Sequence, residues 1–107
     1  MKDGQLCFCI DIDGTICTKT ENQEYEKARP YQTTIKTIRR LYDQGYYIKI
    51  FTARGMGSGR DFTNLTEKQL KKWGVKYHEL IMGKPSADWY VDDKCLTPSE
   101  FNDGWGI

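Results

Sequence analysis

Two aspartates, Asp11 and Asp13, end an apolar run and are followed directly by Gly14 and Thr15. The run, 6–10, is rich in Ile, Phe and Cys, which is typical of a strand covered on both faces. Two carboxylates side by side in a partly dehydrated pocket repel each other unless a cation or a shared proton offsets the cost. This pattern therefore predicts a site for a metal ion, a phosphoryl group, or both.

Further polar groups come directly after three other segments that the sequence predicts as strands. In chain order these are 46–51 with Thr52, 77–82 with Lys84, and 87–91 with Asp92 and Asp93. In a parallel α/β sheet the carboxyl ends of the strands lie along one edge, where ligands bind. We therefore expect all these side chains to face a common site.

This combination of groups suits phosphoryl transfer. Carboxylates bind a hard cation such as Mg²⁺, and the cation, a lysine and a hydroxyl neutralise and orient the phosphoryl oxygens. One carboxylate can attack phosphorus in line. A second acid two residues later can protonate the leaving alkoxide and then deprotonate the hydrolytic water.

Two amphipathic helices are predicted between the strands. In the first, 31–44, apolar residues recur every three or four residues, and Gly45 ends the helix. The second covers about 64–73 and ends at Gly74. Strand, helix and strand in this order form a βαβ unit with a right-handed crossover, which predicts an α/β fold with a parallel sheet.

Two polar segments lie beside these elements. The segment 17–29 has no clear periodicity, and reads equally well as a solvated loop or as a short β-flap that helps to enclose a substrate. The glycine-rich segment 55–60 lacks the spacing of a Walker A or GxGxxG motif. It therefore indicates mobility rather than phosphate binding.

Composition narrows the class of protein. With 107 residues we expect one domain, 1–107. The chain has 16 Lys and Arg against 15 Asp and Glu, which gives a net charge of +1. A charge this small does not attract nucleic acid or an anionic membrane to the protein as a whole. No apolar run approaches the ~18 residues of a membrane span, and the N-terminus lacks a signal-peptide core, so we expect a cytoplasmic protein.

The cysteine and histidine content argues against two kinds of metal site. The four cysteines, at 7, 9, 17 and 95, form no CxxC pair, and we interpret them as reduced, small apolar residues. A single histidine, His78, disfavours a His-based metal site or catalytic triad.

The run from Asp11 to Thr15, DIDGT, resembles the first motif, DxDGT, of the haloacid dehalogenase superfamily of phosphohydrolases. The other three motifs follow in order: Thr52, Lys84 and the pair Asp92 and Asp93. The resemblance covers nearly the whole chain. It implies a three-layer, Rossmann-like core with a parallel sheet, and a phosphatase that uses Mg²⁺.

The resemblance also implies a role for each motif residue. Asp11 is the expected nucleophile, which forms an aspartyl-phosphate, and also a metal ligand. Asp13 is the expected general acid and base, with its backbone carbonyl facing the metal. Thr52 and Lys84 are expected to hold the phosphoryl oxygens.

The remaining metal ligands are expected from the acidic pair, with Asp93 as the direct ligand and Asp92 in the same acidic shell, although their order is open. Ala53 and Arg54 follow Thr52 and are expected beside the substrate. Arg54 and Arg60 are the nearest candidates for contacting substrate charge. The alternative is that both arginines are solvated loop residues.

The chain has no room for a cap domain beside this minimal core. Family members without a cap usually accept bulky substrates or use a neighbouring subunit as a lid. The runs 83–88 and 91–94 resemble the capsule and surface-polysaccharide biosynthesis branch. That resemblance implies a small-molecule phosphoester, either a phosphorylated sugar or a sugar-linked ester.

Three alternatives remain. A phosphotransferase or phosphomutase would use the same groups with another acceptor. A receiver domain of two-component signalling is disfavoured, because its phospho-accepting Asp ends a middle strand, where this chain has Thr52. An inactive binding or scaffold protein is disfavoured, because no motif residue is missing.

The aromatic content bears on assembly. Seven Tyr, four Phe and three Trp are more than the sheet core obviously needs, and Trp73, Trp89 and Trp105 suit either a core or an interface. This favours a homo-oligomer, a dimer or tetramer, whose neighbour partly covers the open site.

Overall fold

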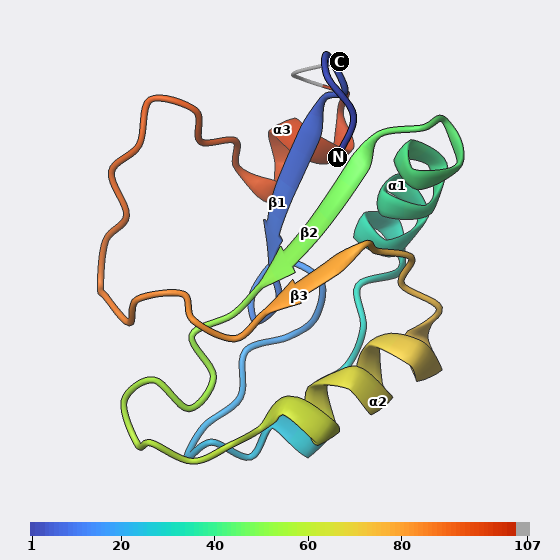
Figure 1. Ribbon diagram of the computed structural model, residues 1–107. Helices are drawn as coiled ribbons and strands as arrows, with labels where there is room; N and C mark the ends of the chain where they lie inside the picture. Colours follow the sequence, from blue (N-terminus) through green and yellow to red (C-terminus); the bar gives the residue numbers. More distant parts are fainter. Residues whose placement is uncertain (105–107) are drawn as a thin grey trace.

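The computed structural model describes residues 1–104, so Trp105 lies outside the described residues. The chain forms a three-stranded sheet, and Figure 1 shows helices beside it. In chain order the elements are β1 (Cys7–Asp11), the 3₁₀ helix η1 (Tyr25–Lys27), α1 (Gln32–Asp43), β2 (Tyr47–Phe51), α2 (Thr63–Trp73), β3 (Glu79–Ile81) and α3 (Pro98–Asn102).

The sheet is parallel, with β2 between β1 and β3. Asp11 pairs with Phe51, and Phe51 pairs with Ile81, so the carboxyl ends of all three strands meet at one edge. The predicted α/β class with a parallel sheet is confirmed. Across residues 1–104, no helix is long and apolar enough to cross a membrane.

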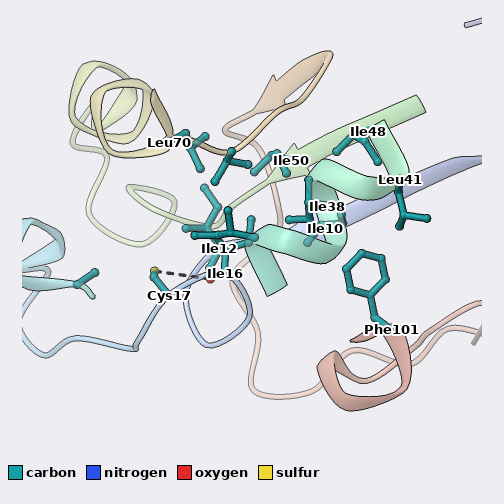
Figure 2. Packing of buried hydrophobic residues seen from close by; sticks show 13 residues of the cluster. Ile10, Ile12, Ile16, Cys17, Ile38, Leu41, Ile48, Ile50, Leu70 and Phe101 are labelled. Carbon is teal, nitrogen blue, oxygen red and sulfur yellow. Dashed lines mark hydrogen bonds between the residues drawn. The ribbon is translucent and has the colours of Figure 1, made fainter. Parts of the chain in front are cut away.

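The core lies on one face of the sheet. Ile10, Ile48 and Ile50 are buried and pack in one cluster with apolar residues of both α1 and α2 (Figure 2). The alternate residues of β1, Cys7 and Cys9, are exposed. The prediction that this strand is covered on both faces is wrong. The connections from β1 to β2 through α1 and from β2 to β3 through α2 move across the sheet in the same direction. Because such parallel connections are right-handed, α1 and α2 lie on the same face of the sheet.

The segment between β3 and α3 corrects a second expectation. No strand forms at 87–91, and Trp89 and Val91 are 87% and 99% exposed. Figure 1 shows this segment as a wide loop away from the sheet. The Tyr90 hydroxyl instead donates to the carbonyl of Pro85 within the loop. Side chains such as Trp, Tyr and Val stabilise a strand mainly through packing on neighbours, and the exposed Trp89 and Val91 have little such packing.

The segment 17–29 is held against the core at both ends. Cys17 bridges to Asp13 and to Pro30, and its side chain is fully buried. Gly14 begins this return with a φ of +86°, and its N–H donates to the carbonyl of Cys17 at 2.8 Å. A side chain at Gly14 would be strained in this conformation and would meet Lys19. The segment is therefore a largely exposed loop whose base is closed by the antiparallel bridge between Cys17 and Pro30, and its one regular element is η1.

Candidate active site

An open pocket of about 440 Å³ lies at the carboxyl ends of the strands. It brings together all the residues predicted beside the phosphoryl group or the substrate, apart from Arg60. The lining consists of Asp11, Asp13, Gly14, Thr15, Lys19, Thr52, Ala53, Arg54, Lys84, Ala87, Asp88, Tyr90 and Pro98. Parallel pairing explains the convergence, because it aligns the ends of β1, β2 and β3.

Asp11 faces the pocket as a partly buried acid. Its carboxylate lies 3.5 Å from Nζ of Lys84, and the two side chains are 30% and 10% exposed. Burial raises the pKa of Asp11, while Lys84 opposes that shift. The effect of burial on this pKa thus exceeds the opposing effect of the Lys84 charge.

Lys84 and Thr52 are held by backbone contacts at the sheet edge. The N–H of Thr52 donates to the carbonyl of Ile81, and the N–H of Lys84 donates to the carbonyl of Thr52 at 3.1 Å. The ammonium of Lys84 lies 4.6 Å from the Phe51 ring centre and 4.1 Å from that of Tyr90. The lysine is therefore fixed beside Asp11 by both its backbone and its side chain.

Asp13 forms a bidentate ion pair with Arg54. Nε of Arg54 donates to Oδ2 at 2.9 Å, and its NH2 group donates to Oδ1 at 2.8 Å. Arg54 is only 3% exposed, so the expectation of a solvated loop arginine is wrong, and the guanidinium is already occupied by Asp13. Arg60 is exposed, with its guanidinium over the Phe62 ring, and it does not line the pocket.

Cys17 lies directly behind Asp13, with Sγ 3.5 Å from Oδ1. Burial, and then the negative charge of Asp13, raise the pKa of the Cys17 thiol to about 12. The thiol therefore stays protonated and donates to the carboxylate. All four cysteines are free, but only Cys17 is buried, whereas Cys7, Cys9 and Cys95 are exposed.

The acidic pair does not join the pocket. Asp92 and Asp93 are exposed on the loop between β3 and α3, and the N–H of Lys94 donates to Asp92 and lowers its pKa. Nowhere in residues 1–104 do three His, Cys, Asp or Glu side chains gather closely enough to hold a metal ion. The expected convergence depended on a strand at 87–91, which does not form, so the role of the pair as metal ligands stays a prediction.

Several lining or supporting residues were missed by the sequence reasoning. They are Lys19 and Asp88 in the pocket, and Tyr25, Thr66 and Gln69 around Arg54. Asp88 carried one local signal, since it lies in the run that contains Lys84. Lys19 and Tyr25 lie in the polar segment 17–29, and Thr66 and Gln69 lie in α2. No motif in either place indicates a functional role.

The fold and pocket define an α/β protein with an acid, a lysine and a threonine at the carboxyl edge of a parallel sheet. Residues 8–78 match the family of haloacid dehalogenase-like hydrolases, and the chain belongs to this family. Among curated proteins, none matches the sequence.

Solved structures share this fold. A structural-genomics target from Vibrio cholerae is 28% identical, with a TM-score of 0.83 over 92% of this chain and 88% of the other. The Pnkp1/Rnl/Hen1 complex is 18% identical, with a TM-score of 0.60 over 97% of this chain and 36% of the other. D,D-heptose 1,7-bisphosphate phosphatase from B. bronchiseptica, complexed with magnesium and phosphate, is 17% identical, with a TM-score of 0.57 over 85% of this chain and 54% of the other. The last two show likeness of fold alone.

Proposed function

We propose that this hydrolase is a Mg²⁺-dependent phosphatase, which cleaves a phosphomonoester through an aspartyl-phosphate on Asp11. The observation that carries the proposal is the pairing of a partly buried Asp11 with Lys84 at 3.5 Å, in a pocket that Thr52 also lines. A carboxylate beside a lysine and a hydroxyl can attack phosphorus while the other two groups hold its oxygens.

The reaction follows from the positions of these groups. A carboxylate oxygen of Asp11 attacks phosphorus, and the bond from phosphorus to the ester oxygen breaks. Asp13 donates a proton to the leaving alkoxide. Asp13 then takes a proton from water, which attacks the phosphorus of the aspartyl-phosphate, so that inorganic phosphate leaves and Asp11 is regenerated. Lys84 and Thr52 orient the phosphoryl oxygens in both steps.

The pocket residues suit a magnesium ion. Mg²⁺ in phosphoryl-transfer sites uses one or two carboxylates together with substrate phosphate oxygens and water. Asp13 is engaged by Arg54, so Asp11 would supply the carboxylate and the backbone carbonyl of Asp13 a second oxygen. The ion would neutralise charge on the phosphoryl group during attack.

We expect chelation to abolish hydrolysis. Excess EDTA should remove phosphate release from a panel of phosphosugars and small phosphoesters, and added Mg²⁺ should restore it, because the phosphoryl charge is otherwise neutralised only by side chains. The control is a thermal melt in EDTA, which should still show a folded protein. Undiminished turnover in excess chelator would contradict the magnesium requirement.

A phosphorylated sugar or a sugar-linked phosphoester is the substrate class we propose, within capsule or surface-polysaccharide biosynthesis. The runs 83–88 and 91–94 and the open pocket support it, and one structural neighbour is a phosphatase of a heptose bisphosphate. Quantifying free phosphate against phosphorylated acceptor in the same panel separates hydrolysis from phosphotransfer.

The sheet order weakens the receiver alternative. Thr52 follows β2, the middle strand, whereas Asp11 ends β1 at an edge of the described sheet. A receiver would need its phospho-accepting acid at the middle position.

We also propose a cytoplasmic homo-oligomer. Trp89 and Val91 are almost fully exposed and lie beside pocket residues Asp88 and Tyr90, so a neighbouring copy that covers them would also approach the site. Light scattering at micromolar concentration should give at least the dimer mass, and Trp89→Ser should lower it. A monomeric wild type would overturn the proposed assembly.

A further inference from the structure

Arg54 is a buried cation whose contacts all lie inside the protein. Its side chain is 0% exposed, although it follows β2 in a segment that leads to an exposed loop. Nε and NH2 bind the two oxygens of Asp13, whereas NH1 donates to Thr66 at 3.1 Å and to Gln69 at 2.6 Å. Burial of a charge is costly unless it is paired and hydrogen-bonded, and these contacts meet both conditions.

The guanidinium is held from two directions. Thr66 and Gln69 belong to α2, and the Tyr25 ring of η1 lies 4.6 Å from the guanidinium carbon. Gln69 also donates to the carbonyl of Tyr25 at 2.6 Å, which ties α2 to the segment 17–29. The orientation of Arg54 is therefore set by two elements that do not otherwise contribute to the pocket.

This arrangement orients the Asp13 carboxylate. A planar guanidinium that binds both oxygens fixes the plane of a carboxylate, which a lysine ammonium does not do. The Asp13 side chain remains 22% exposed and lines the pocket. An ionised carboxylate has about four acceptor positions. Arg54 takes two and the Cys17 thiol a third, so one position remains for the proton that Asp13 passes to the leaving oxygen.

We infer that Arg54 is a positioning residue for proton transfer, which acts on the reaction by holding the Asp13 carboxylate in a fixed orientation towards the pocket. This inference rests on the proposed phosphatase function and on the role of Asp13 within it. Arg54 itself does not touch the substrate, because its donors are directed at Asp13, Thr66 and Gln69.

The test compares Arg54→Lys with wild type on aryl phosphates of graded leaving ability, with Mg²⁺ present. Phenyl phosphate releases a phenol with a pKa of about 10, as for tyrosine, and needs protonation far more than p-nitrophenyl phosphate does. Because a positioned general acid is worth ~10²- to 10⁴-fold, kcat/KM for phenyl phosphate should fall by about 10²-fold and that for p-nitrophenyl phosphate by less than about 10-fold.

Two further variants sharpen the comparison. Arg60→Lys is the matched control, since it makes the same change in an exposed arginine outside the pocket, and it should leave both rates unchanged. The double variant Asp13→Asn with Arg54→Lys should be no more than about 3-fold slower on phenyl phosphate than Asp13→Asn alone, because residues that act as a unit are non-additive.

Equal losses on both aryl phosphates, or effects that multiply in the double variant, would overturn the inference and leave Arg54 with a structural role. If Arg54→Lys does not fold, Gln69→Met removes one anchor of the guanidinium and keeps the Asp13 pair, and it should lower the phenyl phosphate rate more than the p-nitrophenyl rate. Equal losses there would overturn it too. A wild type with no activity on any phosphomonoester would overturn the proposed function, and this inference with it.

Discussion

Asp11→Asn is expected to lower kcat by about 10⁴- to 10⁶-fold, the range seen when a nucleophile or its partner is removed from a covalent catalyst. The amide keeps the volume of the side chain but does not attack phosphorus, so no aspartyl-phosphate forms. The measurement is phosphate release under saturating substrate, together with rapid-quench trapping of labelled phosphoenzyme. Near-normal kcat in this variant would contradict the covalent mechanism.

The control for this variant is its stability, for which the pKa of Asp11 gives a signed expectation. Burial raises that pKa, so the folded protein keeps the Asp11 proton to a higher pH than the unfolded chain does. The free energy of unfolding therefore falls as pH rises from the ordinary carboxyl value through the raised folded value.

The Asn side chain does not titrate, so the free energy of unfolding of Asp11→Asn does not fall over this pH range. The variant should therefore melt at a higher temperature than wild type at neutral pH in EDTA. The two proteins should converge in acid, below the ordinary carboxyl pKa. A less stable variant at neutral pH would mean that the pair with Lys84 contributes more than the burial of Asp11 costs.

Asp13→Asn should separate substrates by their leaving groups. If Asp13 protonates the leaving oxygen, kcat/KM for a sugar phosphate should fall by ~10²- to 10⁴-fold, whereas an activated aryl phosphate departs without protonation and should be far less affected. The Asn oxygen accepts from one nitrogen of Arg54, but its NH2 group faces the other, so a thermal melt of this variant is the control for folding. The comparison uses wild type and Asp13→Asn on a sugar phosphate and on p-nitrophenyl phosphate.

Trapping of phosphoenzyme in single turnovers completes this experiment. Without Asp13 as a base, the attack of water slows, and the intermediate should accumulate. An equal loss on both substrates without phosphoenzyme would leave Asp13 as a structural or metal-shell residue, and would overturn its assignment as acid and base.

The sequence by itself predicted the parallel α/β core and much of the site. An apolar strand that ends in Asp11, and a second that ends in Thr52, are local patterns, and parallel pairing places such ends at one edge whatever the details of packing. Lys84 follows the third strand for the same reason. These residues were predicted because their positions depend on where a strand ends along the chain.

The burial of Arg54 was decided by tertiary structure. In the sequence it is an arginine in a polar segment, and nothing local distinguishes a solvated side chain from one that binds Asp13. The difference comes from α2, because Thr66 and Gln69 lie where the guanidinium needs acceptors only once that helix has packed on the sheet. The partners are 12 and 15 residues away along the chain, and the carboxylate is 41 away.

The open face of β1 and the loop at 87–91 were also decided by tertiary structure. Composition predicted a strand in both places, and it was right only for β1, which has β2 as a hydrogen-bonded neighbour. The one-sided burial of β1 follows from the direction and handedness of two crossovers, which no single segment encodes. Strand ends could be predicted from the sequence because they are local, whereas covered faces and paired charges depend on which distant segments pack together.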